Sequence, residues 1–394
     1  MALRLALLLT ALVAVLPTPV VGQRAVEDTL LWPMPPETPR IRYSAVLQNE
    51  RDLGKTRGFL GRMSNALIGT SDGVVGVMRP HDVFVSTTGL MYVTNGLSGA
   101  IWVFDPSEKE ARLIQPVGAG TLVKPMGLTG DADGNVLVSD PGARRVVELD
   151  LDGAFVRAYG GEDVLLNPVD VTLSPAGDRV YVADAYLHQV VIFDREGALV
   201  ARIGRDEGDL ASKRARRLNA VVAGQEAAGR EAAGASAHGQ DEPSDMVENR
   251  GLEFGEFRYP AFVATAPDGT VYVSDGMNFR VQALDPDGTF LRSVGRLGDS
   301  PGSMARPKGI AVDSEGHLYV VDAAFSNVQI FDDQGRLLLA FGAFGNGPGQ
   351  LWMPTGLWID QADRIFVADR YNNRLQVFEY LSEELGAAQS GTQR

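Results

Sequence analysis

Three residues of the chain could take part in chemistry: His81, Asp82 and Asp170. Each aspartate follows a proline by two positions, where comparable stretches of the chain carry glycine. Two carboxylates pointing into one channel would hold a hard cation such as Ca²⁺, and His81 beside Asp82 could act as a weak metal ligand. The alternative is structural: the aspartates would accept hydrogen bonds from neighbouring strand ends, and the histidine would make a polar contact within the fold.

The elements that must position these residues form a repeat. Each copy opens on a proline, has an Asp or Asn 15 or 16 positions later, and has an apolar residue six positions beyond that. The prolines are Pro80, Pro125, Pro168, Pro260, Pro307 and Pro354, and the closing residues are Asn95, Asp140, Asp184, Asp275, Asp322 and Asp369. A period in the mid-forties with four short strands per copy predicts a β-propeller.

We therefore predict an all-β chain whose residues 40–380 form a six-bladed β-propeller of four-stranded antiparallel blades. Turn pairs such as Asp268-Gly269 suit tight hairpins, because glycine adopts positive φ without steric cost. The sixth copy lacks a fourth strand, so we expect the stretch 40–47 to pair with residues 375–380 and close the ring. Residues 58–68 carry apolar side chains at helical spacing and predict one short N-terminal helix.

Four other segments differ in composition from the repeats. Residues 1–22 resemble a secretory signal peptide, with an apolar run after Arg4. We therefore expect a secreted or periplasmic protein without stable membrane insertion once the signal is removed. Residues 23–39 predict an extended Pro-rich arm with no strand ladder of its own. Residues 205–250 predict a flexible insertion between blades 3 and 4, and residues 381–394 a polar tail.

Charge and composition exclude several classes of partner and of chemistry. The formal net charge is −14 and the sequence contains no cysteine. A strongly acidic chain repels phosphate backbones, so we expect no nucleic-acid partner. The lack of cysteine excludes disulfides, thiolate metal sites and cysteine nucleophiles. We also expect a monomer.

The repeats resemble NHL repeats. The best copy combines Pro307-Lys-Gly-Ile-Ala-Val-Asp313, Leu318-Tyr-Val-Val-Asp322 and Asn327-Val-Gln-Ile-Phe-Asp332. The resemblance covers residues 79–380, and with the arm the chain is similar to exported bacterial six-bladed NHL proteins. NHL propellers include protein- and RNA-binding modules as well as a zinc-dependent amidating lyase, so the resemblance implies the fold and leaves the function open.

One face of the predicted ring is the default binding site, because the loops that enter the first strands and join the second to the third strands emerge there. The residues after the opening prolines should line the channel mouth: His81, Met126, Val169, Ala261, Lys308 and Thr355. Other loop tips on this face are Tyr186, His188, Met277, Phe279, Phe325, Arg370 and Tyr371. Aromatic and Arg side chains supply anchoring contacts. We therefore predict a binding or scaffold module, without cofactor, for a protein, peptide or glycan.

The alternative is a metal-dependent hydrolase or lyase, lactonase-like or amidating-lyase-like, that uses Ca or Zn and is centred on His81, Asp82 and Asp170. The resemblance to the amidating lyase lies at Pro80-His81 and at Ala185-Tyr-Leu-His-Gln189. The lyase places zinc-binding histidines after the prolines of several blades, whereas here His81 alone occupies such a position among four histidines. A three-histidine zinc site is therefore hard to assemble from this sequence.

Overall fold

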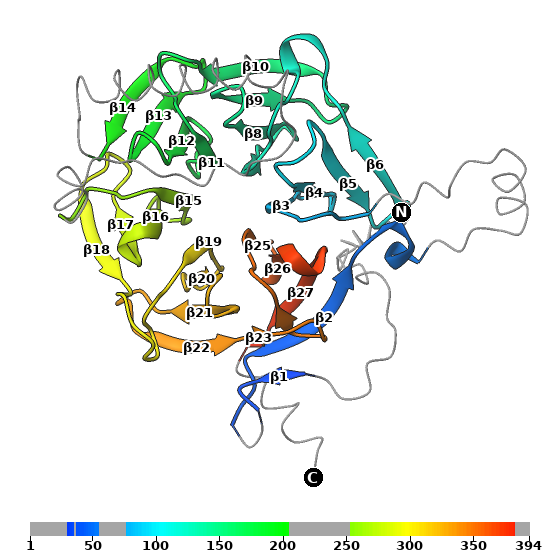
Figure 1. The fold of residues 1–394 in the computed structure, drawn as a ribbon, viewed down its shortest axis with the longest axis vertical. Helices are drawn as coiled ribbons and strands as arrows, with labels where there is room; N and C mark the ends of the chain where they lie inside the picture. Colours follow the sequence, from blue (N-terminus) through cyan, green and yellow to red (C-terminus); the bar gives the residue numbers. More distant parts are fainter. Residues whose placement is uncertain (1–29, 35–36, 55–75, 205–252, 383–394) are drawn as a thin grey trace, which may run out of the picture.

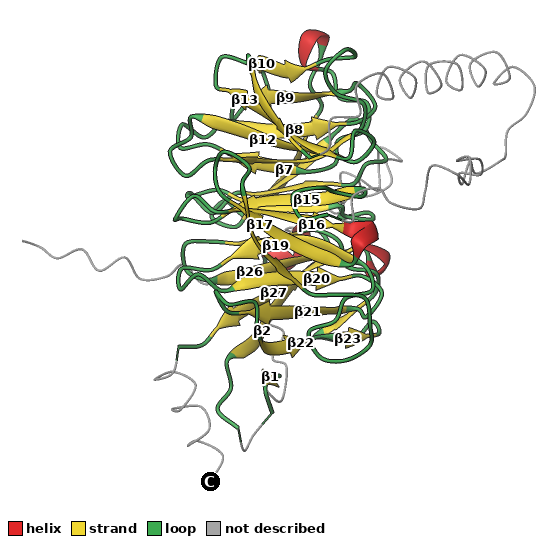
Figure 2. Ribbon diagram, turned by 90° about the vertical axis from the view of Figure 1, so that its left-hand side faces the viewer, coloured by secondary structure: helices red, strands yellow, loops and turns green. Residues whose placement is uncertain are grey.

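The computed structural model describes residues 30–34, 37–54, 76–204 and 253–382. Within these ranges the strands form six antiparallel sheets arranged around a central channel, which confirms the predicted six-bladed propeller (Figure 1). Seen from the side, the strands run across the thickness of the ring (Figure 2). The predicted signal peptide, the helix at 58–68 and the insertion at 205–250 lie outside the described residues.

Blades 1 to 3 each contain four strands in sequence order. Blade 1 comprises β3 (Asp82–Val85), β4 (Met91–Thr94), β5 (Ile101–Asp105) and β6 (Glu110–Ile114). Blade 2 comprises β7 (Leu128–Gly130), β8 (Val136–Asp140), β9 (Arg145–Leu149) and β10 (Phe155–Gly160). Blade 3 comprises β11 (Pro168–Leu173), β12 (Arg179–Asp184), β13 (Gln189–Asp194) and β14 (Leu199–Ile203).

Blades 4 and 5 follow the same plan, and blade 6 differs. Blade 4 comprises β15 (Pro260–Thr265), β16 (Val271–Asp275), β17 (Arg280–Leu284) and β18 (Phe290–Val294). Blade 5 comprises β19 (Pro307–Val312), β20 (Leu318–Asp322), β21 (Asn327–Phe331) and β22 (Leu337–Phe341). Blade 6 comprises β25 (Leu357–Ile359), β26 (Arg364–Asp369), β27 (Arg374–Tyr380), β2 (Ile41–Leu47) and β1 (Leu31–Trp32).

Short elements lie in the loops between the blades. The strands β23 (Ala343–Phe344) and β24 (Gln350–Leu351) pair in parallel before blade 6. The described 3₁₀ turns are η1 (Glu50–Leu53), η2 (Gly118–Gly120), η4 (Gly276–Asn278) and η5 (Arg370–Asn372). Among the described residues, no helix is both long and apolar enough to cross a bilayer.

The position of a strand within its blade explains its sequence. Second strands such as β20 are buried along their whole length, because the sheets of neighbouring blades pack against both of their faces. Outer strands such as β22 alternate between partly buried and exposed residues, because one face meets solvent. The core therefore lies between blades, as a ring of apolar clusters rather than one central mass.

The N-terminal strand closes the ring as predicted. Strand β2 pairs antiparallel with β27, so that Leu47 lies opposite Leu375 and Ile41 opposite Tyr380. Figure 1 shows this N-terminal strand beside the C-terminal strand of the same blade. Blade 6 is therefore built from both ends of the propeller, and its unpaired edge is covered.

The Pro-rich arm differs from the prediction in one respect. Leu31 and Trp32 form β1, which pairs with the start of β2. The Trp32 ring lies 6.0 Å from the ring of Phe341 and 5.8 Å from that of Phe378, measured between centroids. The prediction of an arm without a strand ladder is therefore wrong at these residues. The physical reason is that apolar side chains cover the junction between blades 5 and 6, which brings the backbone into pairing distance of β2.

Candidate functional site

The repeated aspartates organise the loops of the predicted binding face, which we call the mouth face. Asp140 accepts hydrogen bonds from the backbone of Val123 and Lys124 in the loop before β7, and from Gly142 in the loop after β8. Asp184 joins the corresponding two loops of blade 3. These carboxylates are buried and used by the backbone, so they position the mouth loops and are structural.

One layer of residues lies below the mouth, each two positions after an opening proline. The layer consists of Asp82, Gly127, Asp170, Phe262, Gly309 and Gly356. A Cβ atom at Gly127 would overlap Asp170, and one at Gly356 would overlap Asp82. Glycine is therefore required beside each aspartate, because the carboxylate occupies the space that a side chain there would take.

The same layer ties neighbouring blades together. Asp82 Oδ2 accepts a hydrogen bond of 3.0 Å from the Leu128 backbone of blade 2, and Asp170 Oδ2 accepts one of 2.8 Å from Val263 of blade 4. At the glycine positions the backbones of neighbouring blades are joined by direct hydrogen bonds, such as the 2.8 Å hydrogen bond from Gly356 N–H to His81 O. Both aspartates thus accept hydrogen bonds from a neighbouring strand, as expected if their role is structural.

Burial alters the acidity of this aspartate pair. Burial raises the pKa of Asp82 to about 7. Burial also raises the pKa of Asp170 well above its usual value, with the negative charge of Asp82 as the second cause. Both side chains line a cavity of about 490 Å³ that extends along the channel to the hairpin turns on the opposite face, which we call the hairpin face. His81 does not line this cavity, so the structure separates the histidine from the carboxylates.

His81 lies in the channel mouth, above Phe262. The two ring centroids are 5.5 Å apart. The Nη1 atom of Arg370 lies 3.4 Å from His81 Nδ1, and His81 Nε2 is buried without a hydrogen-bond partner in the part of the chain that the structure describes. Burial lowers the pKa of His81 well below its usual value, and the charges of Arg370, Lys308 and Lys124 lower it further. The imidazole is therefore neutral at pH 7.

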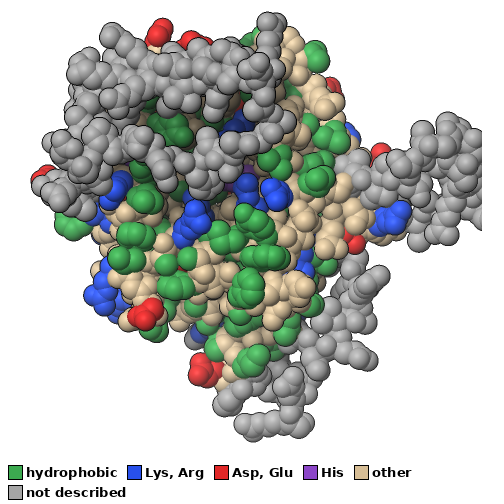
Figure 3. All heavy atoms as spheres, viewed as in Figure 1, with side chains coloured by type: hydrophobic (Ala, Val, Ile, Leu, Met, Phe, Trp, Pro, Cys, Tyr) green, Lys and Arg blue, Asp and Glu red, His purple; other side chains and the backbone are tan. Residues whose placement is uncertain are grey.

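Three cationic side chains from different blades surround this histidine: Lys124 of blade 2, Lys308 of blade 5 and Arg370 of blade 6. Figure 3 shows Lys and Arg side chains beside a histidine near the centre of the face that it displays. Burial lowers the pKa of Lys308 to about 8, and the charges of Arg306 and Arg370 act in the same direction. Within the described part of the chain, none of the three side chains forms an ion pair.

An aromatic row adjoins the cationic mouth. It consists of Tyr371, Trp352 and Phe344, all exposed. Tyr371 stacks on Trp352 with ring centroids 5.7 Å apart, Phe344 meets Trp352 edge-on at 6.0 Å, and the Arg79 guanidinium lies 5.7 Å above Tyr371. Sequence reasoning found Tyr371 but missed Trp352 and Phe344, because they lie in the long entry loop of blade 6 and outside the repeat pattern.

The remaining predicted loop residues lie on the mouth face with different exposure. Tyr186 and Met277 are exposed, whereas Phe279 and Phe325 are half-buried. His188 is buried, and its Nδ1 accepts a 2.9 Å hydrogen bond from the Tyr259 backbone. His188 thus links blade 3 to the entry loop of blade 4 and is not presented to a ligand.

The residues present do not suit a zinc site. Among the described residues, no three His, Asp or Glu side chains are grouped closely enough to hold a metal ion. Guanidinium N–H groups only donate, so Arg370 requires a lone pair on His81 Nδ1 and places the proton on Nε2. A zinc ligand needs a lone pair on the coordinating nitrogen, and nearby positive charge disfavours a cation further.

Comparisons with known proteins agree on the fold. The family model DUF5128, described as a 6-bladed beta-propeller, matches residues 313–386. A probable peptidyl-alpha-hydroxyglycine alpha-amidating lyase of Caenorhabditis elegans is 31% identical over 104 residues, which cover 24% of this chain and 29% of that protein. The peptidylglycine alpha-amidating monooxygenase of Rattus norvegicus is 28% identical over 116 residues, 27% of this chain and 12% of that protein. The chain thus spans less than a third of the curated relatives it matches.

Two solved structures share the architecture over most of the chain. A gluconolactonase from Xanthomonas campestris aligns with a TM-score of 0.52 and 15% identity, over 77% of this chain and 87% of its own. A streptogramin B lyase aligns with a TM-score of 0.51 and 13% identity, over 77% of this chain and 94% of its own. At this level of identity the similarity shows a shared fold and no activity.

Proposed function

We propose that this chain is a binding module whose mouth face holds a protein, peptide or glycan ligand. The observation that carries the proposal is the segregation of side chains between the two faces of the ring. In a chain of net charge −14, the channel mouth is cationic and its surroundings are apolar. A face of this composition is typical of a recognition surface.

The exposed apolar side chains support this choice of face. Large exposed apolar residues gather in the mouth-face loops: Met78, Leu97, Val123, Tyr186, Phe254, Met277, Leu297, Phe344, Trp352 and Tyr371. Among the described hairpin turns of the opposite face, Leu151 alone belongs to this class. Those turns instead carry carboxylates such as Asp133, Asp152 and Asp287.

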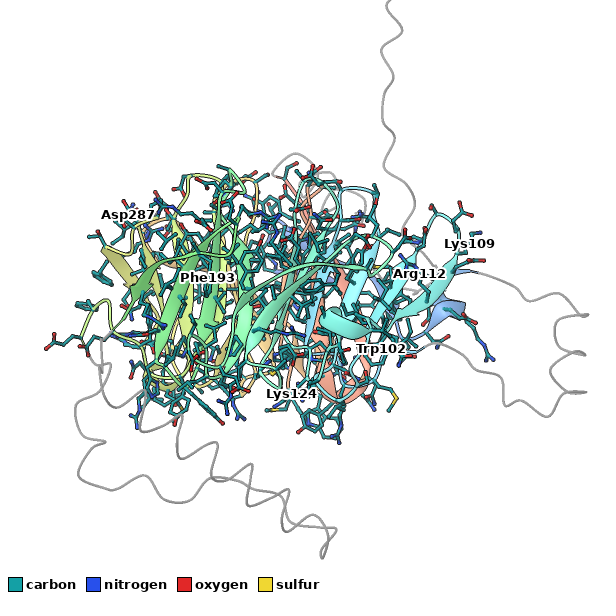
Figure 4. All side chains as sticks on the ribbon, turned by 90° about the horizontal axis from the view of Figure 1, so that it is seen from above. Trp102, Lys109, Arg112, Lys124, Phe193 and Asp287 are labelled. Carbon is teal, nitrogen blue, oxygen red and sulfur yellow. The ribbon has the colours of Figure 1, made fainter. Side chains whose placement is uncertain are left out.

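The two faces are separated by the thickness of the ring. In Figure 4 the labelled Lys124 lies at one rim, whereas Asp287 and Lys109 lie at the opposite rim. A ligand on the mouth face would therefore be remote from the acidic turns, and anionic ligands would be attracted to the mouth and repelled from the other side.

A binding screen with matched variants tests the proposal. Immobilised peptides and glycans are probed with the wild-type protein, with Tyr371→Ala and with Phe155→Ala. Phe155 is an exposed aromatic residue of the outer strand β10, away from the mouth. We expect Tyr371→Ala to weaken binding of the best ligands at least tenfold and Phe155→Ala to leave it unchanged. Equal effects of both variants, or no selective ligand in either class, would contradict the proposal.

A second candidate function is a metal-dependent hydrolase or lyase. What favours it is the pair of buried carboxylates in a cavity of about 490 Å³, together with the partial sequence similarity to amidating lyases. Asp82 and Asp170 would contribute oxygen ligands to a hard cation there, and the cation would supply Lewis-acid chemistry. Stoichiometric Ca in the purified protein that is lost in Asp170→Ala would establish this candidate over the first.

We also propose that the protein is secreted or periplasmic, on the strength of the signal-like residues 1–22. Fractionation of expressing cells, with N-terminal sequencing of the exported protein, tests this. A product that stays inside the cell with residues 1–22 intact would refute it.

A further inference from the structure

We propose that the channel mouth is a pocket for a single carboxylate group of a peptide ligand, formed by His81, Lys308 and Arg370. This inference rests on the proposed binding function and names the group that the site recognises. Such a pocket requires a hydrogen-bond donor, a net positive charge and no anion from the protein that already neutralises this charge.

His81 supplies the donor. Because Arg370 Nη1 donates toward Nδ1 over 3.4 Å, the ring proton of the neutral imidazole resides on Nε2. That Nε2–H group is buried and has no hydrogen-bond partner among the described residues, and His81 as a whole is only 6% exposed. Leaving a buried donor unpaired is unfavourable because the group has lost its hydrogen bonds to water, and an oxygen acceptor in the mouth would restore one.

Lys308 and Arg370 supply the charge, with Lys124 nearby. These cations come from three blades, and their positive charges act together on His81. Arg370 also lowers the pKa of Lys308, which shows that the two charges repel each other. A bound anion would offset this repulsion, so the site gains more from an anion than an isolated surface lysine does.

The groups beneath the mouth do not supply that anion. Asp82 and Asp170 line the cavity below, and the Phe262 side chain lies against the His81 ring between the two spaces. Both carboxylates have raised pKa values and accept hydrogen bonds from neighbouring strands. They therefore do not neutralise Lys308 or Arg370.

The aromatic row favours a peptide over a sugar as the carrier of the carboxylate. Sugar rings bind to free aromatic faces, but Tyr371 is already engaged by Arg79 and by Trp352. Apolar peptide side chains can pack against the ring edges that remain exposed. Tyr371 directly follows Arg370 in η5, so the residues next to a carboxylate bound at Arg370 would contact the aromatic row.

Small defined probes test the pocket in the full-length protein. Binding is measured by protein NMR titration for N-acetylphenylalanine, for N-acetylphenylalaninamide, for an amidated N-acetylaspartate, for glucuronate and for inorganic phosphate. The first and third probes separate a C-terminal carboxylate from a side-chain carboxylate. We expect at least one of them to bind at least tenfold more tightly than the uncharged amide, glucuronate or phosphate.

Variants locate the binding. Lys308→Met should weaken binding of the carboxylate probe at least tenfold, Lys308→Arg should largely restore it, and Lys109→Met on the opposite rim should have no effect. Equal binding of acid and amide, tighter binding of glucuronate or phosphate, or an unchanged affinity in Lys308→Met would each overturn the inference. If the screened ligands still depend on Tyr371 but not on Lys308, the pocket is wrong and the binding function stands; if they depend on neither, both fail.

Discussion

Arg370 Nη1 lies 3.4 Å from His81 Nδ1, so that a guanidinium of blade 6 faces an imidazole of blade 1 across the channel mouth. This relationship decides between two chemistries for the histidine. It leaves the ring proton on Nε2, which has no hydrogen-bond partner among the described residues, and it opposes coordination of a cation by the same ring.

The first prediction concerns zinc. Purified protein should contain less than one tenth of an equivalent of Zn, because the cations around His81 repel a metal ion and no group of three possible metal ligands lies among the described residues. Elemental analysis of wild-type protein and His81→Ala measures this. One equivalent of Zn in the wild type that disappears in His81→Ala would show that the argument from Arg370 is wrong.

The second prediction concerns the pH dependence of carboxylate binding. The pKa of Lys308 is lowered to about 8, so the side chain is charged below this pH and neutral above it. Affinity for N-acetylphenylalanine should therefore be constant from pH 6.5 to 7.5 and fall above pH 8, by up to about tenfold per pH unit. The charged neighbours whose repulsion lowers the pKa of Lys308 are Arg306 and Arg370.

Calorimetric titration at several pH values tests this dependence, with Lys308→Arg as the control. Arginine stays charged to much higher pH, so the decline should disappear in that variant. An identical decline in both proteins would assign it to another group.

The third prediction concerns the buried aspartates and stability. Folded Asp82 keeps its proton up to about pH 7, whereas an unfolded chain loses it near pH 4. Between these values the folded state binds more protons, so the free energy of unfolding falls as pH rises, by up to about 1.4 kcal/mol per pH unit from pH 5 to 6.5. Asp170 has a raised pKa as well and adds to the effect.

Chemical denaturation of wild-type protein and of Asp82→Asn/Asp170→Asn checks the third prediction. Asparagine keeps the acceptor oxygen for the neighbouring backbone but does not titrate. The variant should lose this part of the pH dependence. Parallel stability curves for the two proteins would contradict the raised pKa values.

The fourth prediction concerns closure of the ring. Ile41 is fully buried in β2, where it packs between blades 5 and 6. Ile41→Ala should lower the free energy of unfolding by about 2–5 kcal/mol, because it leaves a cavity at the seam. The control is Arg42→Ala on the same strand, which removes a partly exposed ion pair with Glu379 and should cost no more than about 1 kcal/mol.

Deletion of residues 24–48 removes the closing strand altogether and should lower the free energy of unfolding much more than Ile41→Ala does. Thermal melting monitored by circular dichroism compares Ile41→Ala, Arg42→Ala and the deletion variant with the wild-type protein. An unchanged melting temperature after the deletion would mean that β2 does not hold the ring together.

The propeller could be predicted from the sequence because its information is local and repeated. The spacing of 15 residues from Pro307 to Asp322 recurs within one residue in every blade, and the hydrogen bonds of closing aspartates such as Asp322 are made within their own blade. Closure by β2 was also predictable, since one strand was missing and one β-prone stretch was spare. The repeat spacing and the closing strand could be predicted because they depend on residues close together in the sequence and on the general rules of strand pairing.

The site itself required the tertiary structure. Lys124, Lys308 and Arg370 are far apart in the sequence, and only the ring brings their charges together on His81. Conversely, His188 looked available in its loop but is buried by the Tyr259 backbone of the next blade.

The contacts of Glu148 also could not be predicted from the sequence. It appears to be an ordinary strand residue, yet it is buried between blades 2 and 3, where it binds Arg195 at 3.0 Å and the Tyr159 hydroxyl at 2.6 Å. The sequence by itself determined the ring, its six blades and the strand that closes it, because identical local pairing is repeated at each blade. Only the tertiary structure decided which side chains meet in the channel, because burial, charge and hydrogen-bond partners there come from different blades.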